Sequence, residues 1–317
     1  MTSGGRQLLI TLSNIGDAVM TTPVLLAMHA LHPDTAVDIV ADARSAELFG
    51  PCPFRGDILL KNKKEGWRGT CRLVRALRRH RYRLIVDLRT DGLSWLLRAQ
   101  GRRTKRLART HGGHAVERAY AVVAGLLHDS APPPTRLWLS DSQRDFATRC
   151  TAVLPVGRWL AVAPGANWPP KCWPVSHFQA LMQMMRDDVD AIVLLGGPGD
   201  QGACAELAAT SALPVLDLAG KTSLLQAAAV IERVSLFIGN HSGLGHIAAA
   251  IGAATLTLFG PGDPARYRPW GPRAEWLVAD DGDIATLSPE TVTDKARVML
   301  RAAQAARASV AENGAHR

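Results

Sequence analysis

Residues 236–260, LFIGNHSGLGHIAAAIGAATLTLFG, constrain the fold most strongly, because they pass from a strand pattern to a helix pattern and back. The apolar run at each end is typical of a buried parallel strand. Between the runs, Gly-Asn-His at 239–241 ends the first strand, and Ser242 is placed to cap a helix that ends at Gly252. A helix N-terminus of small residues behind a strand attracts anions. The stretch predicts a phosphate-facing turn, with a plain strand–helix–strand unit as the alternative.

The same alternation fills most of the chain. Short apolar strands and helical segments follow one another from residue 8 to 99, where 91–99 reads as a helix, and again from 160 to 279. This pattern is typical of parallel, doubly wound sheets. Between the two series, residues 128–136 (HDSAPPPTR) contain three consecutive prolines and suit a linker.

We therefore expect an α/β protein with two Rossmann-like, doubly wound domains that face each other across a cleft. Their expected bounds are residues 1–150 and 151–317. The final helix, 288–309, is rich in alanine, and we allow for its packing back on the first domain.

The net charge of +9 is concentrated in residues 61–109, where 17 Lys and Arg residues outweigh three acids. Such a segment attracts nucleic acid, an anionic membrane or a phosphorylated substrate, unless it is only a solvated helix face. An aromatic content of 5% without a stacking platform argues against nucleic acid. The five cysteines include no C-x-x-C pair, so neither a zinc site nor a disulfide framework is indicated. No apolar run approaches the roughly 18 residues that span a bilayer, and we expect a cytoplasmic protein.

Three loops at the expected carboxyl ends of strands carry polar residues, and open parallel sheets bind ligands there. Asp17 begins a helix beside Gly16, Lys171 follows one buried strand, and Asp200 follows the next. A lysine can hold a phosphate, and a carboxylate can accept both hydroxyls of a ribose. Each residue also has an ordinary role, as helix-start acid, solvated lysine or helix cap. Together they favour group transfer from a nucleotide diphosphate.

Four ordered motifs carry a resemblance to a known family. They are G-D-A-V-M-T-T-P (16–23), P-G-A-x-x-x-x-K-x-W-P (164–174), G-N-x-S-G-x-x-H-x-A-A-A-x-G (239–252) and F-G-P-x-D-P-x-R (259–266). In this order, over residues 6–272, the chain resembles glycosyltransferase family 9, the ADP-heptose:lipopolysaccharide heptosyltransferases. The resemblance implies the GT-B architecture, with the acceptor on the N-terminal domain and the sugar nucleotide on the C-terminal one. It also implies inversion at the anomeric carbon without a metal ion.

The resemblance assigns roles to particular residues. Asp17 matches the family's proposed general base, and Lys171 matches the lysine that contacts the donor phosphates. Asp200 falls where the family has an acid that binds the adenosine ribose. The remaining expected substrate-binding residues are Asn14, Gly16, Thr22, Asn167, His241, Ser242, Gly243, Leu244 and His246.

One position departs from the family's pattern, because His241 stands where the family usually has Asp. A shared metal site with His246 is disfavoured, since five residues along one helix place side chains on different faces. The leading hypothesis is transfer of a heptose from ADP-heptose to an anionic lipopolysaccharide core acceptor, without a cofactor, in peripheral contact with the inner membrane.

Three alternatives remain open at this stage. A family 9 enzyme could use another sugar nucleotide or a soluble acceptor, and a protein with His241 could bind a sugar nucleotide without catalysis. An NAD-dependent oxidoreductase is disfavoured because the turn at 239–243 lacks the glycine fingerprint G-x-G-x-x-G.

Overall fold

The computed structural model describes residues 5–89, 92–105, 113–127 and 131–315. The chain divides into two units, residues 1–138 and 139–317. Each unit has its own sheet, and every strand pairing in both sheets is parallel. Two Rossmann-like sheets therefore form, as the alternation of strands and helices predicts.

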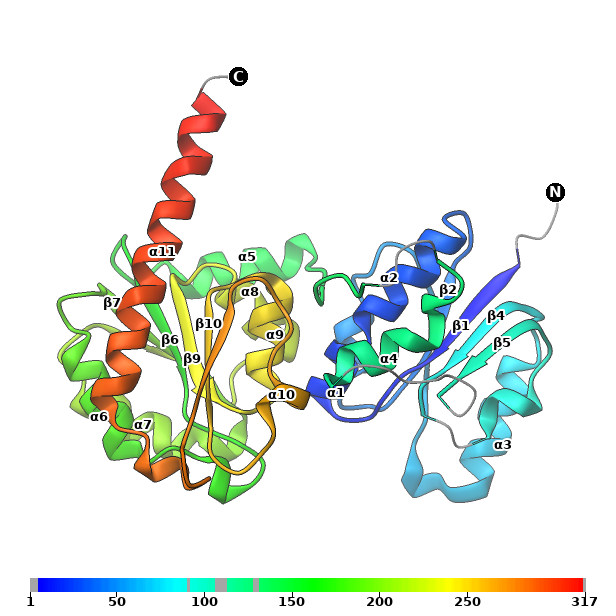
Figure 1. The fold of residues 1–317 in the computed structure, drawn as a ribbon, viewed down its shortest axis with the longest axis horizontal. Helices are drawn as coiled ribbons and strands as arrows, with labels where there is room; N and C mark the ends of the chain where they lie inside the picture. The colour runs from blue at the N-terminus through cyan, green and yellow to red at the C-terminus, as the bar shows by residue number, and fades with distance from the viewer. Residues whose placement is uncertain (1–4, 90–91, 106–112, 128–130, 316–317) are drawn as a thin grey trace. The chain divides into compact units, whose positions relative to one another are not determined.

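The sheet of the first unit has the order β3-β2-β1-β4-β5 (Figure 1). Because β1 lies in the middle and β4 pairs with its other side, the direction of winding reverses between β1 and β4. The strands are β1 (Arg6–Ile10), β2 (Val37–Ala41), β3 (Arg55–Leu60), β4 (Tyr82–Asp87) and β5 (Ala99–Thr104).

Helices cover both faces of this sheet. On one face α1 (Ile15–Met20), α2 (Thr22–Leu31) and α4 (Ala115–Ala124) pack on one another. On the other face α3 (Gly66–Leu77) and the short 3₁₀ helix η3 (Leu93–Leu96) close a core with β1, β2 and β4. Two further 3₁₀ helices, η1 (Ala46–Phe49) and η2 (Lys63–Glu65), flank β3.

The sheet of the second unit has the order β11-β10-β9-β6-β7-β8. Its winding reverses between β6 and β9, so this pair of strands is the switch point of the second unit. The strands are β6 (Trp159–Ala163), β7 (Ala191–Leu194), β8 (Val215–Asp217), β9 (Leu236–Asn240), β10 (Thr255–Phe259) and β11 (Ala274–Val278).

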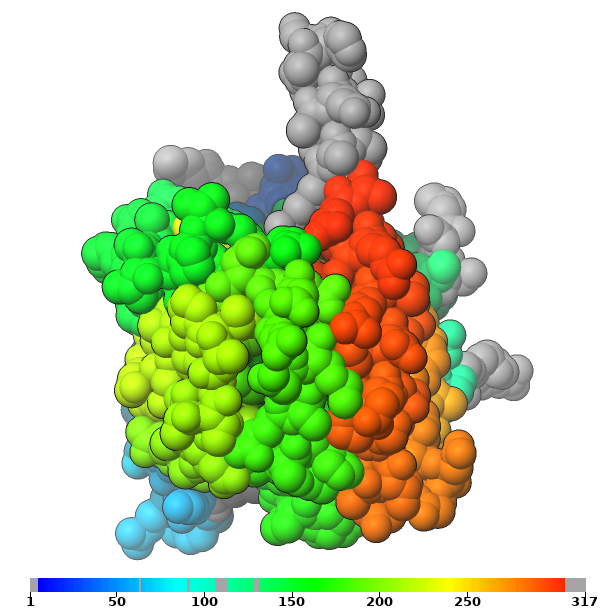
Figure 2. Space-filling view, turned by 90° about the vertical axis from the view of Figure 1, so that its left-hand side faces the viewer, coloured from blue at the N-terminus to red at the C-terminus, as the bar shows by residue number. Residues whose placement is uncertain are grey.

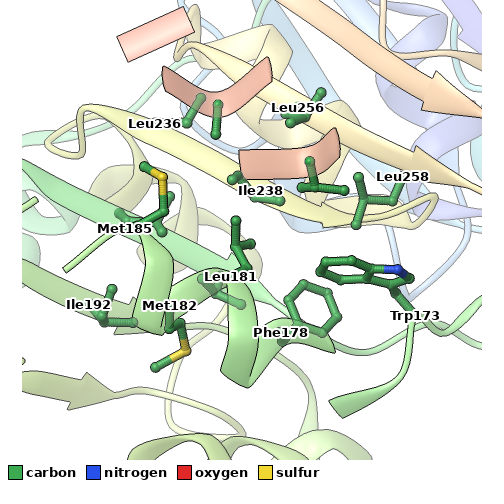
Figure 3. Close-up of a cluster of buried hydrophobic side chains, with 14 of the residues drawn as sticks. Trp173, Phe178, Leu181, Met182, Met185, Ile192, Leu236, Ile238, Leu256 and Leu258 are labelled. Atoms are coloured by element: carbon green, nitrogen blue, oxygen red, sulfur yellow. The ribbon is translucent and has the colours of Figure 1, made fainter. Parts of the chain in front are cut away.

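Alternate residues of these strands point to two helical layers. On one face α6 (Val175–Met184), α7 (Gln201–Thr210) and α11 (Pro289–Ala315) lie side by side (Figure 2). They enclose a core in which the Trp173 ring meets Phe178 edge to face, with centroids 4.8 Å apart (Figure 3). The opposite layer holds α5 (Asp141–Thr151), α8 (Leu224–Ile231) and α9 (Gly243–Ile251). The short helices of this unit are η4 (Pro169–Lys171), η5 (Pro198–Asp200), α10 (Pro264–Tyr267) and η6 (Ile284–Thr286).

Three expectations from the sequence need correction. The division between the units comes before α5 rather than after residue 150, because α5 packs on α8 of the second unit. The final helix packs on α6 and β9 of its own unit, through apolar residues between Val292 and Ala303. The expected helix at 91–99, whose first residue lies outside the described ranges, is instead η3 followed by the edge strand β5.

None of the helices in the described residues combines the length and the apolar content that a membrane crossing requires.

Candidate functional site

The candidate donor site lies at the switch point of the second unit, where the carboxyl ends of β6 and β9 diverge. Asn240 ends β9 and is fully buried. Its amide nitrogen donates to the Pro164 carbonyl at 2.6 Å, and its amide oxygen accepts from the Trp173 N–H at 3.0 Å. One side chain thus joins the end of β9 to both ends of the loop after β6. This clamp fixes the loop that carries Lys171.

Trp173 anchors the same loop on the core of the second unit. Its indole N–H donates to the Leu287 carbonyl at 2.8 Å, and its ring packs on Phe178. Lys171 ends η4 two residues earlier and is half-buried. Its ammonium therefore stands on a loop held at both ends, which suits a cation that must meet a phosphate with little rearrangement.

The clamp predicts a large stability effect at Asn240. Asn240→Ala would leave the buried Trp173 N–H and Pro164 carbonyl without partners, and each such loss costs roughly 1–3 kcal/mol. We expect the free energy of unfolding to fall by about 2–5 kcal/mol in urea titrations. Asn167→Ala is the matched control, since Asn167 is exposed in the same loop, and its change should stay within about 0.5 kcal/mol. Equal effects of the two substitutions would contradict the clamp.

Lys171 lies beside His241, the residue that departs from the family's pattern. The Lys171 Nζ and His241 Nδ1 atoms are 3.4 Å apart. The imidazole stacks on Phe259 with centroids 4.3 Å apart. Burial, and then the charge of Lys171, lower the pKa of His241 to about 4, against the opposing effect of a hydrogen bond with the Tyr267 backbone. His241 is therefore neutral at pH 7, and its Nδ1 accepts from the lysine.

This lowered pKa gives a stability prediction with a definite sign. His241 titrates near 6.5 when unfolded and near 4 when folded, so between these values the unfolded chain binds more protons. The stabilisation is complete above pH 6.5 and is lost as the pH falls toward 4. We expect the wild type to lose roughly 2–4 kcal/mol more than His241→Asn between pH 7 and 4, measured by urea unfolding at each pH. Parallel curves for the two proteins would refute the assignment.

The turn after β9 supplies the second component of the site. Ser242 occupies the N-cap position of α9, but its side chain makes no capping hydrogen bond, contrary to the expected cap. Gly243 and Leu244 begin the helix and are partly exposed, whereas Gly245 is buried. A Cβ at Gly245 would lie 3.2 Å from the Thr257 hydroxyl, so glycine lets α9 pack closely on β10. The N–H groups of the first turn and the Ser242 hydroxyl can then both serve an anion.

The two histidines are arranged differently from the expectation that both lie on one helix. His241 precedes α9 and His246 lies within it and is buried. Their ring centroids are 6.0 Å apart and the rings are tilted by 53°. His246 thus stands behind the turn, while His241 borders it together with Lys171.

Asp200 closes the neighbouring loop at the end of β7. Its carboxylate accepts from the Gly197 N–H at 2.8 Å. Side-chain atoms of Asp200 occupy the space where a Cβ on Gly165 or Gly196 would lie. The carboxylate therefore packs at the carboxyl ends of β6 and β7, beside the loop of Lys171, and closes the turn of η5. It makes no capping hydrogen bond to the following helix α7, and its contact with a ribose stays a prediction.

A glycine pattern in this loop was missed in the sequence. Residues 197–202, GPGDQG, have the spacing G-x-G-x-x-G. However, the pattern follows β7 and not β6, the first strand of its unit. Neither Gly199 nor Gly202 has a heavy atom within 4 Å of an added Cβ, and neither has a positive φ. This segment therefore lacks the close approach that the dinucleotide fingerprint requires.

The first unit has its own polar edge at the ends of β1 and β4. Asp17 lies in the first turn of α1, half-buried, and its carboxylate accepts from the Asn14 side chain at 2.9 Å. Gly16 lies between them in the chain. Arg89 follows β4, and its backbone N–H donates to Asp87 at 3.0 Å. A carboxylate and a guanidinium thus flank the switch point of the first unit.

Nearby charges also perturb Asp42, which follows β2. Its burial acts against the shift, but hydrogen bonds from Arg44 and the charges of Arg44 and Arg89 lower the pKa of Asp42 below its ordinary value. Arg89 therefore faces the same edge as Asp42. Its place at the switch point makes it a candidate for binding an anionic substrate, a role that its position in a long basic segment did not reveal.

Thr22 does not belong to this edge as a ligand-binding residue. It is fully buried, its hydroxyl donates to the Val19 carbonyl at 2.8 Å, and it accepts from the Arg136 N–H at 3.0 Å. The hydroxyl ties the end of the first unit to α2. Asn167, by contrast, is exposed in the loop of Lys171, where it can meet a ligand.

Comparisons with known proteins agree with this arrangement. A model of "Glycosyltransferase family 9 (heptosyltransferase)" matches residues 90–296. Lipopolysaccharide heptosyltransferase 3 of Escherichia coli (strain K12) is 27% identical over 283 residues, which cover 80% of this chain and 82% of that protein.

Two solved structures have the same fold. The structure of E. coli ADP-heptose lps heptosyltransferase II has a TM-score of 0.79 at 22% identity, covering 94% of this chain and 99% of that one. E. coli heptosyltransferase WaaC with ADP has a TM-score of 0.76 at 21% identity, covering 93% and 99%. The expected GT-B fold class is confirmed.

Proposed function

This chain belongs to glycosyltransferase family 9, the heptosyltransferases, and from that premise we propose that it moves a heptose from ADP-heptose to a lipopolysaccharide inner-core acceptor. The reaction inverts the anomeric carbon and uses neither a metal ion nor another cofactor. Relatives named lipopolysaccharide heptosyltransferase support the acceptor class, and a structural neighbour that holds ADP supports the nucleotide.

The observation that carries the donor part of the proposal is the placement of Lys171 beside the N-terminus of α9. Both lie at the switch point of the second unit, and Asn240 fixes the loop that carries Lys171. When the glycosidic bond to ADP breaks, negative charge grows on the leaving diphosphate. The Lys171 ammonium, the first-turn N–H groups and the Ser242 hydroxyl meet that charge without a metal ion. The Asp200 carboxylate, at the end of the neighbouring strand, accepts hydrogen bonds from the ribose hydroxyls.

His241 completes this donor site in a way that the usual Asp cannot. A neutral imidazole adds no negative charge beside the diphosphate, and it can exchange its hydrogen bond from Lys171 for one with the donor. Lys171 can then turn its protons to the phosphate. We infer that His241 orients the lysine in the unbound protein and contacts the donor in the complex.

The acceptor part of the proposal rests on the first unit. Asp17, oriented by Asn14, takes the proton from the acceptor hydroxyl as that oxygen attacks the anomeric carbon on the side opposite ADP. Arg89 and Arg44 lie at the same edge of the sheet and suit an acceptor that carries acidic sugars or phosphates. The acceptor's lipid places the reaction at the cytoplasmic face of the inner membrane.

The test is product analysis by mass spectrometry. The full chain is incubated with ADP-heptose and a deep-truncated lipopolysaccharide acceptor, in chelator and then in added Mg²⁺. We expect one heptose on the acceptor, equal amounts of released ADP, and the same rate in both buffers. A panel of other ADP- and UDP-sugars serves as the control. Turnover of a different sugar alone, or binding without product, would overturn the proposal.

A further inference from the structure

A groove lined by arginines lies on the first unit, away from the candidate site. Two hollows of about 600 and 480 Å³ meet at Arg78 and Arg79, which line both of them. We call the combined feature the arginine groove. It lies between the end of α3, the 3₁₀ helix η3 and the first residues of β4 and β5.

The groove opens at the amino ends of the strands, whereas the candidate acceptor site lies at their carboxyl ends. Arg81 directly precedes β4 and Arg98 directly precedes β5. Asp17 and Arg89 follow β1 and β4, which are parallel strands. The strand length therefore separates the two groups, by about 20 Å for six residues. A ligand in the groove would not compete with the acceptor hydroxyl at Asp17.

Four of the arginines that line the groove have no acidic partner among the described residues. No acid lines either hollow, and the guanidinium groups of Arg75, Arg79, Arg81 and Arg98 have no hydrogen bond or ion pair with any described residue. Behind His80, which lines the first hollow, the carboxylates of Asp38 and Asp57 lie within 4.8 Å of the imidazole, and Arg6 pairs with both. Six arginines line the groove: Arg75, Arg78, Arg79, Arg81, Arg98 and Arg102.

Two of the arginines are held in place by the backbone of η3 and the residues next to it. Arg78 Nε donates to the Leu96 carbonyl at 2.8 Å. Arg102 donates to the carbonyls of Ser94 and Leu97 at 3.0 and 2.9 Å. Their remaining N–H groups are preorganised for an anion, and planar guanidinium groups suit phosphate oxygens.

Apolar side chains that are partly exposed to solvent border the same groove. Val74 and Leu96 line the second hollow. Leu96 is 48% exposed and Trp95 is 58% exposed, and the Arg102 guanidinium lies 5.0 Å from the Trp95 ring centroid. At the other end of α3, Trp67 is 71% exposed beside Arg68. Exposed tryptophan and leucine among arginines are typical of surfaces that meet a membrane interface.

The dipole of α3 explains only part of this positive surface. Cations at the end of a helix complement its dipole, and Arg78 and Arg79 follow α3. Arg81 and Arg98 lie outside any helix, and the dipole gives no reason to expose Trp95. A concave shape, positive charge and an exposed apolar ring together suit an anionic, amphiphilic partner.

We propose that the arginine groove docks this protein on a bilayer of anionic phospholipid, with headgroup phosphates on the arginines and Trp95 and Leu96 in the interfacial layer. The groove lies at the end of α3 and at the amino ends of β4 and β5. Docking there leaves the carboxyl ends of the strands, with Asp17, open. The proposal adds a membrane surface to the proposed function, but binding can be measured without catalysis.

The experiment is co-sedimentation of the full chain with phosphatidylcholine vesicles, with and without about 30% phosphatidylglycerol, at fixed ionic strength. The groove variant carries Arg79→Gln, Arg81→Gln and Arg98→Gln. Its matched control carries Arg149→Gln, Arg186→Gln and Arg301→Gln, which remove the same charge from exposed sites on the second unit. A third variant is Trp95→Ser.

We expect the wild type to bind only the anionic vesicles. The groove variant should lose about tenfold or more in partition coefficient, and Trp95→Ser about threefold, while the control stays within about twofold. Equal losses in the groove and control variants would show that net charge alone is responsible and would overturn the proposal. The proposal would also be overturned if heparin, a soluble polyanion, bound the wild type more tightly than the vesicles do and only the groove substitutions abolished that binding.

A separate assay distinguishes this inference from the proposed function. Transfer to a short soluble acceptor without acyl chains should have the same kcat in the wild type and the groove variant. If the protein binds vesicles but transfers no sugar, the docking proposal holds and the proposed reaction is wrong. If it transfers the sugar but does not bind vesicles, the reaction holds and the docking proposal is wrong.

Discussion

Asp17→Asn is expected to lower kcat by about 10²–10⁴-fold, because the substitution removes the proton acceptor while keeping the shape of the side chain. The Asn14 amide can still donate to the oxygen of the new side chain, so the start of α1 should be unchanged. The proposed donor site lies in the other unit, so the Kd for ADP should stay within about twofold. Initial rates with saturating acceptor and calorimetric titration of ADP measure the two quantities.

The matched control for this substitution is Asp42→Asn. Asp42 lies at the same edge of the same sheet, but its carboxylate pairs with Arg44 at 3.1 Å. Its loss removes one ion pair and should change kcat by less than about fivefold. The assignment of Asp17 as the base fails if Asp17→Asn is as active as Asp42→Asn. It also fails if the variant loses ADP binding in proportion to its activity.

Lys171→Met should have the second largest effect. Methionine keeps the apolar stem and removes the charge that meets the leaving diphosphate. We expect kcat/KM for the donor to fall about 10²–10³-fold, and ADP to bind at least about tenfold more weakly. The His241 Nδ1 atom would lose its donor at 3.4 Å, and without the lysine's charge the pKa of His241 should rise toward its ordinary value. An NMR titration of the imidazole detects that rise independently of activity.

Lys221→Met provides the comparison for Lys171. Lys221 follows β8 at the same edge of the second sheet, where it is exposed and 3.7 Å from the Asp217 carboxylate. A general loss of positive charge would affect both variants alike, whereas a phosphate contact affects only Lys171. Lys171→Met with unchanged ADP affinity would remove this residue from the donor site.

The sequence was sufficient to predict the elements that carry the site. Buried parallel strands such as β6 and β9 are continuous apolar runs, and each ends at a turn whose small residues and prolines are visible in the chain. Two such series predict two doubly wound sheets, and the rule for ligands at strand ends then selects the loops of Asp17, Lys171 and Ser242. Local patterns were enough because each loop directly follows its strand.

Features that depend on tertiary contacts could not be predicted. Strand β5 carries Arg102 and Arg103, which an edge strand tolerates, and these charges break the apolar pattern by which a strand is recognised. The clamp by Asn240 joins residues 67 and 76 positions apart, and no local pattern reveals such contacts. The register that places Lys171 beside His241 arises in the same way.

A crystal structure of the full chain with bound ADP tests the central claim most directly. We expect diphosphate oxygens within about 3.2 Å of Lys171 Nζ and of the backbone N–H groups at 243–245, with the ribose hydroxyls on Asp200. Ordered ADP whose diphosphate lies elsewhere, with Lys171 and the α9 turn making no contact to it, would contradict the account.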